Sequence, residues 1–335
     1  MKKNKLVYFL IFISPVILIL LTLFNGRYPI PLKDIPRVLV YPFLQGENYQ
    51  DTFYTIIWKI RMPRAILSGL VGASLAVSGA AFQGLFHNPL VNSGMLGVSS
   101  GAGFGAALAI LLFARSSIYV YIFALFFGSV AVFLSYTIGR IYNTTPTIML
   151  VLGGTVISSM FSALLSMIKY IADPVNKLPA ITFWLMGSFA SVSEQDILIG
   201  APPMLIGIVG LILMRWRINV LSMGDLESKT LGINSNLNKL TAIVFATLST
   251  AGAVCVSGTI GWIGLIIPHI GRMIVGNDNK LLIPLSCALG ASFLIVIDNI
   301  ARTLISGEIP IGILTSLIGG PFFIYLLKRT KGGSW

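Results

Sequence analysis

Residues 65–85 read AILSGLVGASLAVSGAAFQGL and contain no Asp, Glu, Lys or Arg. A helix of about 20 apolar residues crosses the hydrocarbon core of a bilayer. Runs of this kind recur along the 335 residues, of which 56% are hydrophobic and 10% are charged, against about 25% charged in soluble domains. The sequence therefore predicts an all-α polytopic membrane protein and excludes a soluble enzyme. No polar stretch is long enough for a second, soluble domain.

Ten membrane spans account for the apolar runs. Working outward from residues 65–85, we expect spans at 6–24, 65–85, 96–113, 118–138, 148–171, 197–214, 240–260, 263–275, 281–305 and 311–327. The span at 263–275 is short and contains Pro268, so we expect it to be broken or to cross only partly. Residues 25–59 are expected as a polar outer stretch, and 181–190 as a surface piece too short to cross. The whole chain, 1–335, is expected to form one transmembrane domain.

Positive charge predicts the orientation. Lys2, Lys3 and Lys5 precede the first span, and basic residues are enriched on the cytoplasmic side of membrane proteins. We therefore expect a cytoplasmic N-terminus, and ten spans return the C-terminus to the same side. The net charge of +12 then reflects topology and contact with anionic lipids rather than nucleic acid binding.

Catalytic and cofactor motifs are missing from the sequence. There is no G-x-x-x-x-G-K-[ST] phosphate loop, so the chain is not expected to hydrolyse ATP by that route. His87 and His269 form no H-E-x-x-H motif, and Cys255 and Cys287 lie in apolar runs without a C-x-x-C. We expect no enzymatic activity, no bound cofactor and no metal site in this chain.

Asp298 and Arg302 are charged residues within a predicted span, where such residues are functional candidates. They lie four positions apart, which places them on one helical face and predicts an intramembrane ion pair. In one interpretation the pair only lets the helix end tolerate an arginine. In another, Arg302 emerges at the outer surface to meet a partner while Asp298 orients it. A proton relay is a third alternative.

The polar interruption at 218–239 has two interpretations. Gly224 and Gly232 bracket a short helix-forming piece in which Asp225 can cap the N-terminus. It is either an ordinary solvated loop or a short rigid helix that presses into a groove of a soluble subunit and transmits motion.

Several short motifs together resemble one known family. The sequence is similar to the iron-complex and vitamin B12 (FecCD/BtuC-type) permeases of ATP-binding-cassette (ABC) importers. The similar stretches, all in family order, are Arg61 to Arg64 (RMPR), Gly72 to Leu90 (GASLAVSGAAFQGLFHNPL), Trp184 to Ser188 (WLMGS), Leu221 to Gly232, Gly261 to Arg272 (GWIGLIIPHIGR) and Glu308 to Gly312 (EIPIG).

This resemblance implies a ten-helix type II importer permease in a bacterial or archaeal plasma (inner) membrane. It implies a homodimer, two cytoplasmic ATPase subunits that bind ATP and Mg²⁺, and an extracytoplasmic substrate-binding protein. The implied cargo is a metal chelate (iron-siderophore, haem or cobalamin) or an oxyanion. Residues 178–188 are similar to a subgroup that includes molybdate and tungstate importers. An ion-coupled secondary transporter remains the alternative function, although its usual buried acidic groups are scarce here.

The resemblance also implies roles for individual residues. The residues expected to dock the binding protein are Arg61, Arg64 and Arg302. The residues expected to couple to the ATPase are Gly224, Asp225, Leu226, Glu227, Ser228, Lys229 and Gly232. The residues expected at the inner gate and along the pathway are Asn88, Leu90, Thr145, Ser158, Ser162 and Ser166.

Overall fold

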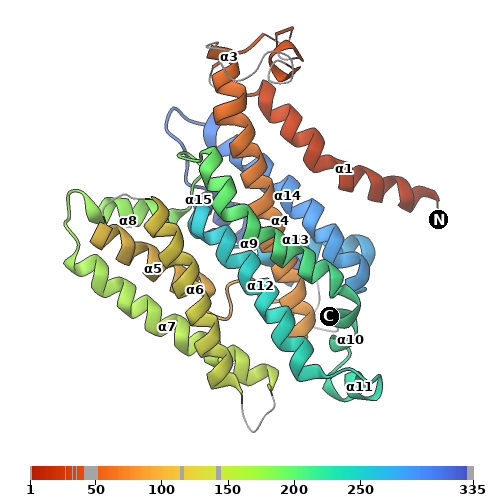
Figure 1. Ribbon diagram of the computed structural model, residues 1–335. Helices are drawn as coiled ribbons and strands as arrows, with labels where there is room; N and C mark the ends of the chain where they lie inside the picture. Colours follow the sequence, from red (N-terminus) through yellow and green to blue (C-terminus); the bar gives the residue numbers. More distant parts are fainter. Residues whose placement is uncertain are drawn as a thin grey trace.

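The computed structural model describes residues 2–26, 28–31, 33–34, 36–40, 52–113, 117–140 and 145–329, and these residues fold as helices and connecting turns without a strand (Figure 1). The longer helices are α1 (Lys2–Phe24), α4 (Met62–Phe86), α5 (Val98–Phe113), α6 (Ser117–Gly139), α7 (Thr147–Ile171), α9 (Glu194–Leu213), α12 (Ser235–Ser257), α13 (Ile263–Val275), α14 (Asn279–Thr303) and α15 (Ile311–Arg329). The shorter elements are α3 (Thr52–Tyr54), the π-helix η1 (Thr55–Arg61), α8 (Lys177–Met186), α10 (Arg215–Leu221) and α11 (Asp225–Thr230).

Ten apolar helices lie where the ten membrane spans were predicted. Within the described residues, seven helices are long and apolar enough to cross a bilayer, and three shorter apolar helices bring the total to ten. The short helix α13 has the predicted bounds, 263–275, and Pro268 lies inside it. Apolar composition and length therefore sufficed to locate the spans.

The prediction for residues 25–59 was wrong at its C-terminal end. Residues 36–40 are helical, and α3, η1 and α4 form one helical run of 35 residues from Thr52 to Phe86. Pro63 lies in the first turn of α4, directly after the π-helical turns. Because proline lacks an N–H donor, it is normally expected to end a helix. Here the widened π-helical turns precede the proline and the helix continues.

Of the two interpretations of the polar interruption at 218–239, the structure has the short helix between Gly224 and Gly232, and the predicted surface piece is also helical. Helices α10 and α11 follow one another between α9 and α12. The piece predicted at 181–190 is α8, which begins earlier, at Lys177, and ends before Gly187.

Helix α4 lies at the centre of the bundle and contacts α14, α12, α13 and α9 (Figure 1). Where α4 crosses α14, the two backbones are in direct contact at glycines. A Cβ atom added at Gly72 would lie 2.2 Å from the carbonyl oxygen of Gly290. Small residues at such crossings let membrane helices approach closely. The crossing places the charged groups near the start of α4 beside those near the end of α14.

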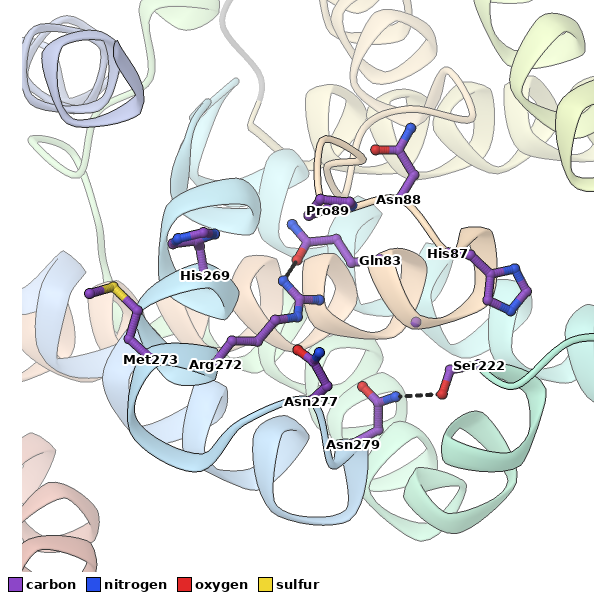
Figure 2. Close-up of a pocket in the computed structure, with 11 residues that line it drawn as sticks. Gln83, His87, Asn88, Pro89, Ser222, His269, Arg272, Met273, Asn277 and Asn279 are labelled. Carbon is purple, nitrogen blue, oxygen red and sulfur yellow. Dashed lines mark hydrogen bonds between the residues drawn. The ribbon is translucent and has the colours of Figure 1, made fainter. Parts of the chain in front are cut away.

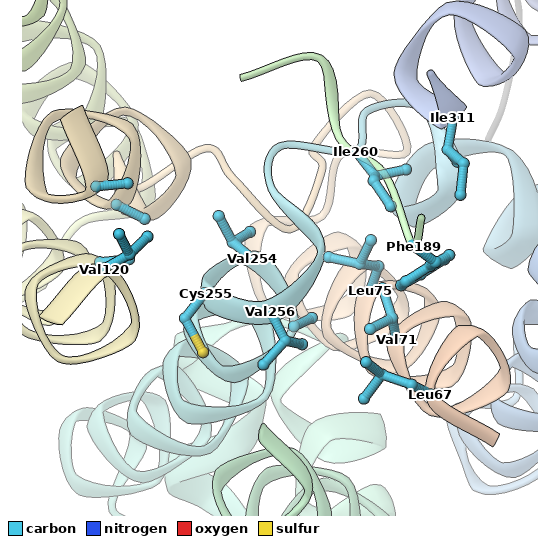
Figure 3. Close-up of a cluster of buried hydrophobic side chains, with 14 of the residues drawn as sticks. Leu67, Val71, Leu75, Val120, Phe189, Val254, Cys255, Val256, Ile260 and Ile311 are labelled. Atoms are coloured by element: carbon cyan, nitrogen blue, oxygen red, sulfur yellow. The ribbon is translucent and has the colours of Figure 1, made fainter. Parts of the chain in front are cut away.

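Buried apolar side chains from distant segments meet around α4 (Figure 3). Leu67 and Val71 of α4 are fully buried, and they share a cluster with Val254 of α12 and Ile311 of α15. Cys255 is also buried in this cluster, as expected for a packing residue. Because lipid is as apolar as leucine, close packing rather than escape from water stabilises these contacts.

Candidate functional site

The elements that carry the docking and coupling candidates lie at two opposite ends of the bundle (Figure 1), and the pathway serines lie along α7. We call one the α3 end, where α1 and α14 finish and α4 begins. We call the other the α11 end, where α4 finishes and α7, α12 and α14 begin. Side-chain contacts tie distant segments together at each end.

At the α3 end, Arg64 holds two carboxylates. Its guanidinium donates from Nε and Nη2 to the two oxygens of Asp298 at 2.8–3.0 Å, and from Nη1 to Oε1 of Glu308 at 2.9 Å. The side chains of Arg64 and Asp298 are 8% and 6% exposed, and that of Glu308 is 30% exposed. A bidentate arginine–carboxylate pair of this kind is strong and directional. We call these three residues the Arg64 network.

The predicted ion pair between Asp298 and Arg302 stays a prediction, and the structure adds a partner of Asp298 that was not predicted. Within the described residues, Asp298 pairs across the helix crossing with Arg64, while Arg302 donates from Nη2 to the carbonyl oxygen of Thr22 at 2.9 Å. A spacing of four residues predicts partners on the same helix only. The guanidinium of Arg64 lies on a different helix, α4, so this spacing could not predict its contact with Asp298. Glu308 was not predicted as a partner, although it lies in the quoted EIPIG motif.

Arg61 is buried and bound to the backbone. It is 4% exposed, and it donates to the carbonyl oxygens of Leu23 at 2.5 Å and Tyr28 at 2.6 Å. The structure thus brings the three predicted docking arginines to one end of the molecule, where each has contacts within the chain. Their role in docking stays a prediction.

At the α11 end, α11 is a six-residue helix held by its buried side. The hydroxyl of Ser228, fully buried, donates to the carbonyl oxygens of Gly224 and Val220 at 2.6 and 3.1 Å. Gly224 has a φ of +126°, a conformation that glycine adopts without strain. The predicted coupling residues Leu226, Glu227, Lys229 and Gly232 are exposed. The result is a fixed helix with an exposed outer face.

The predicted gate residues differ in exposure. Asn88 and Leu90 are exposed in the turn after α4, where the side chain of Asn88 accepts a hydrogen bond from the backbone N–H of Leu90 at 2.9 Å. Thr145 lies just before α7 and is only 3% exposed. The pathway serines lie on α7: Ser158 is half-buried, whereas Ser162 and Ser166 are exposed.

Lys239 was missed by sequence reasoning as a residue of this site. It lies near the start of α12 and is 2% exposed. Its Nζ lies 2.7 Å from Oδ1 of Asp225 and donates to the carbonyl oxygen of Thr145 at 3.4 Å. The buried ammonium of Lys239 therefore contacts both Asp225, a predicted coupling residue, and Thr145, a predicted gate residue.

A polar cavity of about 370 Å³ also lies at the α11 end, between the end of α4, α13 and the start of α14 (Figure 2). Arg272 enters it and donates to Oε1 of Gln83. The amide of Gln83 is held by the carbonyl oxygens of Val91 and Gly264, to which its Nε2 donates. Asn88 also lines the cavity, and its lining contains no Asp or Glu. This cavity can accept an acidic or polar group beside the predicted gate.

Comparison with known proteins decides the family. The model of the FecCD transport family matches residues 13–329. This chain belongs to the FecCD transport family. It is 38% identical over 318 residues to the molybdate import system permease protein MolB of Haemophilus influenzae, covering 95% of this chain and 94% of that protein. It is 40% identical over 320 residues to a Helicobacter pylori protein named as an iron chelatin transport system permease, covering 95% and 96%.

Structural comparison supports the same assignment. The fold matches a solved structure described as an inward-facing metal-chelate type ABC transporter with a TM-score of 0.85 and 37% identity, covering 97% of this chain and 99% of that one. This FecCD family member is therefore a multi-pass permease subunit of an ABC importer with the type II fold, and it is not the catalytic subunit. Such a permease works with an ATPase and a binding protein.

Proposed function

We propose that two copies of this permease enclose a pathway for a metal chelate or a metal oxyanion such as molybdate, with two ATPase subunits at the α11 end and a substrate-binding protein at the α3 end. The family assignment supports the transport class. The observation that supports the placement of the partners is the geometry of α11. Its buried side is held by hydrogen bonds of Ser228, and its outer side chains are exposed and free to contact a partner. The chain itself is proposed to bind neither cofactor nor metal, and ATP and Mg²⁺ to bind to the ATPase.

The α11 end is proposed to face the cytoplasm, together with both termini. Basic residues that follow or precede spans gather at this end. They are Arg215, Arg217, Lys229, Lys239, Arg272 and Lys280. Their distribution agrees with the positive-inside rule. The three predicted docking arginines of the α3 end, Arg61, Arg64 and Arg302, have contacts within the chain.

The outer face of α11 offers an apolar surface suited to a soluble partner. Leu226 is 73% exposed, and three neighbouring apolar side chains are at least half exposed. These neighbours are Met223, Leu231 and Leu237. Because soluble ends of proteins seldom leave clustered apolar side chains uncovered, this surface is suited to a groove in an ATPase subunit.

The second copy is proposed to lie against α7. This helix is largely uncovered within one chain: only 28% of an apolar 18-residue stretch of it is buried. Its uncovered face includes the apolar residues Met160 and Met167 together with Ser162 and Ser166. Such a mixed face fits a smooth, weakly polar passage between two subunits better than contact with lipid alone.

Reconstitution tests the proposed function. We expect the purified permease alone to hydrolyse no ATP, and liposomes with permease, ATPase and binding protein to take up cargo only with ATP. A protonophore and a sodium ionophore should leave this uptake intact. ATP-independent uptake that stops when an ion gradient collapses would instead identify a secondary transporter.

The docking proposal is best tested at Arg302, because its side chain is half-buried whereas Arg61 and Arg64 are buried. Arg302→Glu is expected to weaken binding-protein affinity at least about tenfold at low salt, and less at high salt, because salt screens partly exposed charges. The measurement is titration of liganded binding protein onto the complex in nanodiscs. Basal ATPase activity should persist.

Lys169→Glu provides the matched control, since Lys169 is a half-exposed basic residue in the last turn of α7. It should leave the affinity within about twofold of wild type. An equal loss in both variants, or no loss with Arg302→Glu, contradicts docking at Arg302.

A further inference from the structure

We propose that Lys239 is the positioning residue that transmits movement of α11 to Thr145 and Pro146, which directly precede α7 and which we call the gate segment. The proposal rests on the proposed function, in which α11 receives the movement of the ATPase. It assigns to one buried side chain the step between the ATPase contact and the pathway.

The geometry of Lys239 joins three segments. The residue lies on α12, and its ammonium is 2.7 and 2.8 Å from the two carboxylate oxygens of Asp225, the first residue of α11. The same ammonium donates to the carbonyl oxygen of Thr145, two residues before α7 begins. The Asp225 side chain is 51% exposed, so the ion pair runs from the surface helix into the interior.

A second contact fixes the gate segment on α12. The hydroxyl of Thr145 donates to Oδ1 of Asn236 at 3.2 Å, and Asn236 lies in the first turn of α12. Pro146 follows Thr145 and caps α7 in an extended conformation. Because proline restricts its own φ and the conformation of the residue before it, this connection is stiff. A displacement of Thr145 is therefore passed to the start of α7.

Helix α7 connects the gate segment to the proposed pathway. It is the helix of Ser158, Ser162 and Ser166, and it forms one uninterrupted run from Thr147 to Ile171. Helical rods transmit displacement along their length because their backbone hydrogen bonds resist bending. Movement at the α11 end can thus reach the proposed passage through α7.

The burial of Lys239 explains why the link resists breaking. A buried ammonium without a partner is costly, and removing one partner of a buried ion pair is strongly destabilising. Among the described acidic residues, Asp225 is the one in ion-pair contact with Lys239. When α11 moves, the ammonium must follow Asp225 or lose that partner, and following changes its contact with Thr145.

The test compares variants of the assembled complex in liposomes by the number of ATP molecules hydrolysed per cargo molecule transported. Lys239→Met keeps the length of the side chain and removes its charge. We expect the ATPase to stay bound and to hydrolyse ATP, while transport per ATP falls at least tenfold. Lys239→Arg should retain most of the coupling. Lys280→Met is the control: Lys280 is an exposed lysine of the same end, and its loss should change nothing.

Asp225→Asn provides a second variant if Lys239→Met fails to fold, since the amide oxygen of asparagine can still accept a hydrogen bond from the buried ammonium while the ion pair is lost. It too should lower transport per ATP with the ATPase bound. Normal transport per ATP in either folded variant overturns the role of Lys239, as does release of the ATPase, which would make Lys239 a docking anchor only. Failure of the proposed function is a different result: the unmodified complex would transport without ATP.

Discussion

Arg64→Leu is expected to remove most of the folded permease from the membrane. The substitution leaves the buried carboxylate of Asp298, 6% exposed, beside Glu308 with the guanidinium gone. Breaking a buried ion pair by removing one partner costs about 3–5 kcal/mol. That loss is a large part of the roughly 5–15 kcal/mol that stabilises a typical domain. The measurement is the yield of monodisperse permease together with its melting temperature in detergent.

Compensating variants separate charge from shape at the Arg64 network. Asp298→Leu with Glu308→Gln in the Arg64→Leu background should restore much of the yield, because apolar replacement of a whole buried ion cluster is often neutral. Arg64→Lys should fall between wild type and Arg64→Leu, since lysine keeps the charge but not the bidentate fork. Wild-type stability of Arg64→Leu would show that the network does not hold α4, α14 and the 308 segment together.

The spans could be predicted from sequence because each is a local property. A membrane-spanning helix is encoded by one continuous stretch of apolar residues, and the thickness of the bilayer sets the length of that stretch. The structure departs from the prediction where local rules conflict. Residues 52–59 were assigned to the polar outer stretch, whereas in the structure they belong to the helical run that continues through η1. Tertiary packing at the α3 end outweighs the local preference there.

The candidate site was predictable only in part, because its contacts join residues far apart in sequence. Asp298 was identified as a buried charge, but its partner Arg64 lies 234 positions away. Lys239 is the last residue of the predicted polar segment 218–239, and nothing in its neighbours indicates that it is buried. Gln83 gave a usable signal, since an amide inside a charge-free span needs partners.

Ser228→Pro is expected to abolish transport by releasing the ATPase. The backbone N–H of Ser228 donates to the carbonyl oxygen of Gly224, and its hydroxyl makes two further bonds to backbone carbonyls. Proline removes both donors, and with them all three bonds, and it cannot continue the six-residue helix. We expect uptake to fall at least a hundredfold and the ATPase to be lost when the permease is purified.

Graded and folding controls make this result specific to α11. Ser228→Ala removes the hydroxyl but keeps the backbone bond, so it should cost about 1 kcal/mol locally and leave most of the transport. The melting temperature of the isolated permease should change little in either variant, because α11 lies outside the apolar clusters around α4. Full uptake by Ser228→Pro would contradict any coupling through α11.

The two α11-end variants also test each other. Ser228→Pro destroys the helix that meets the ATPase, so binding and transport should disappear together. Lys239→Met leaves α11 in place and removes its connection to Thr145, so binding should persist while transport per ATP falls. If both variants release the ATPase, the buried ion pair serves only to shape the docking surface. If only the proline variant does, docking and transmission are separate steps carried by separate residues, and the ammonium of Lys239 lies between them.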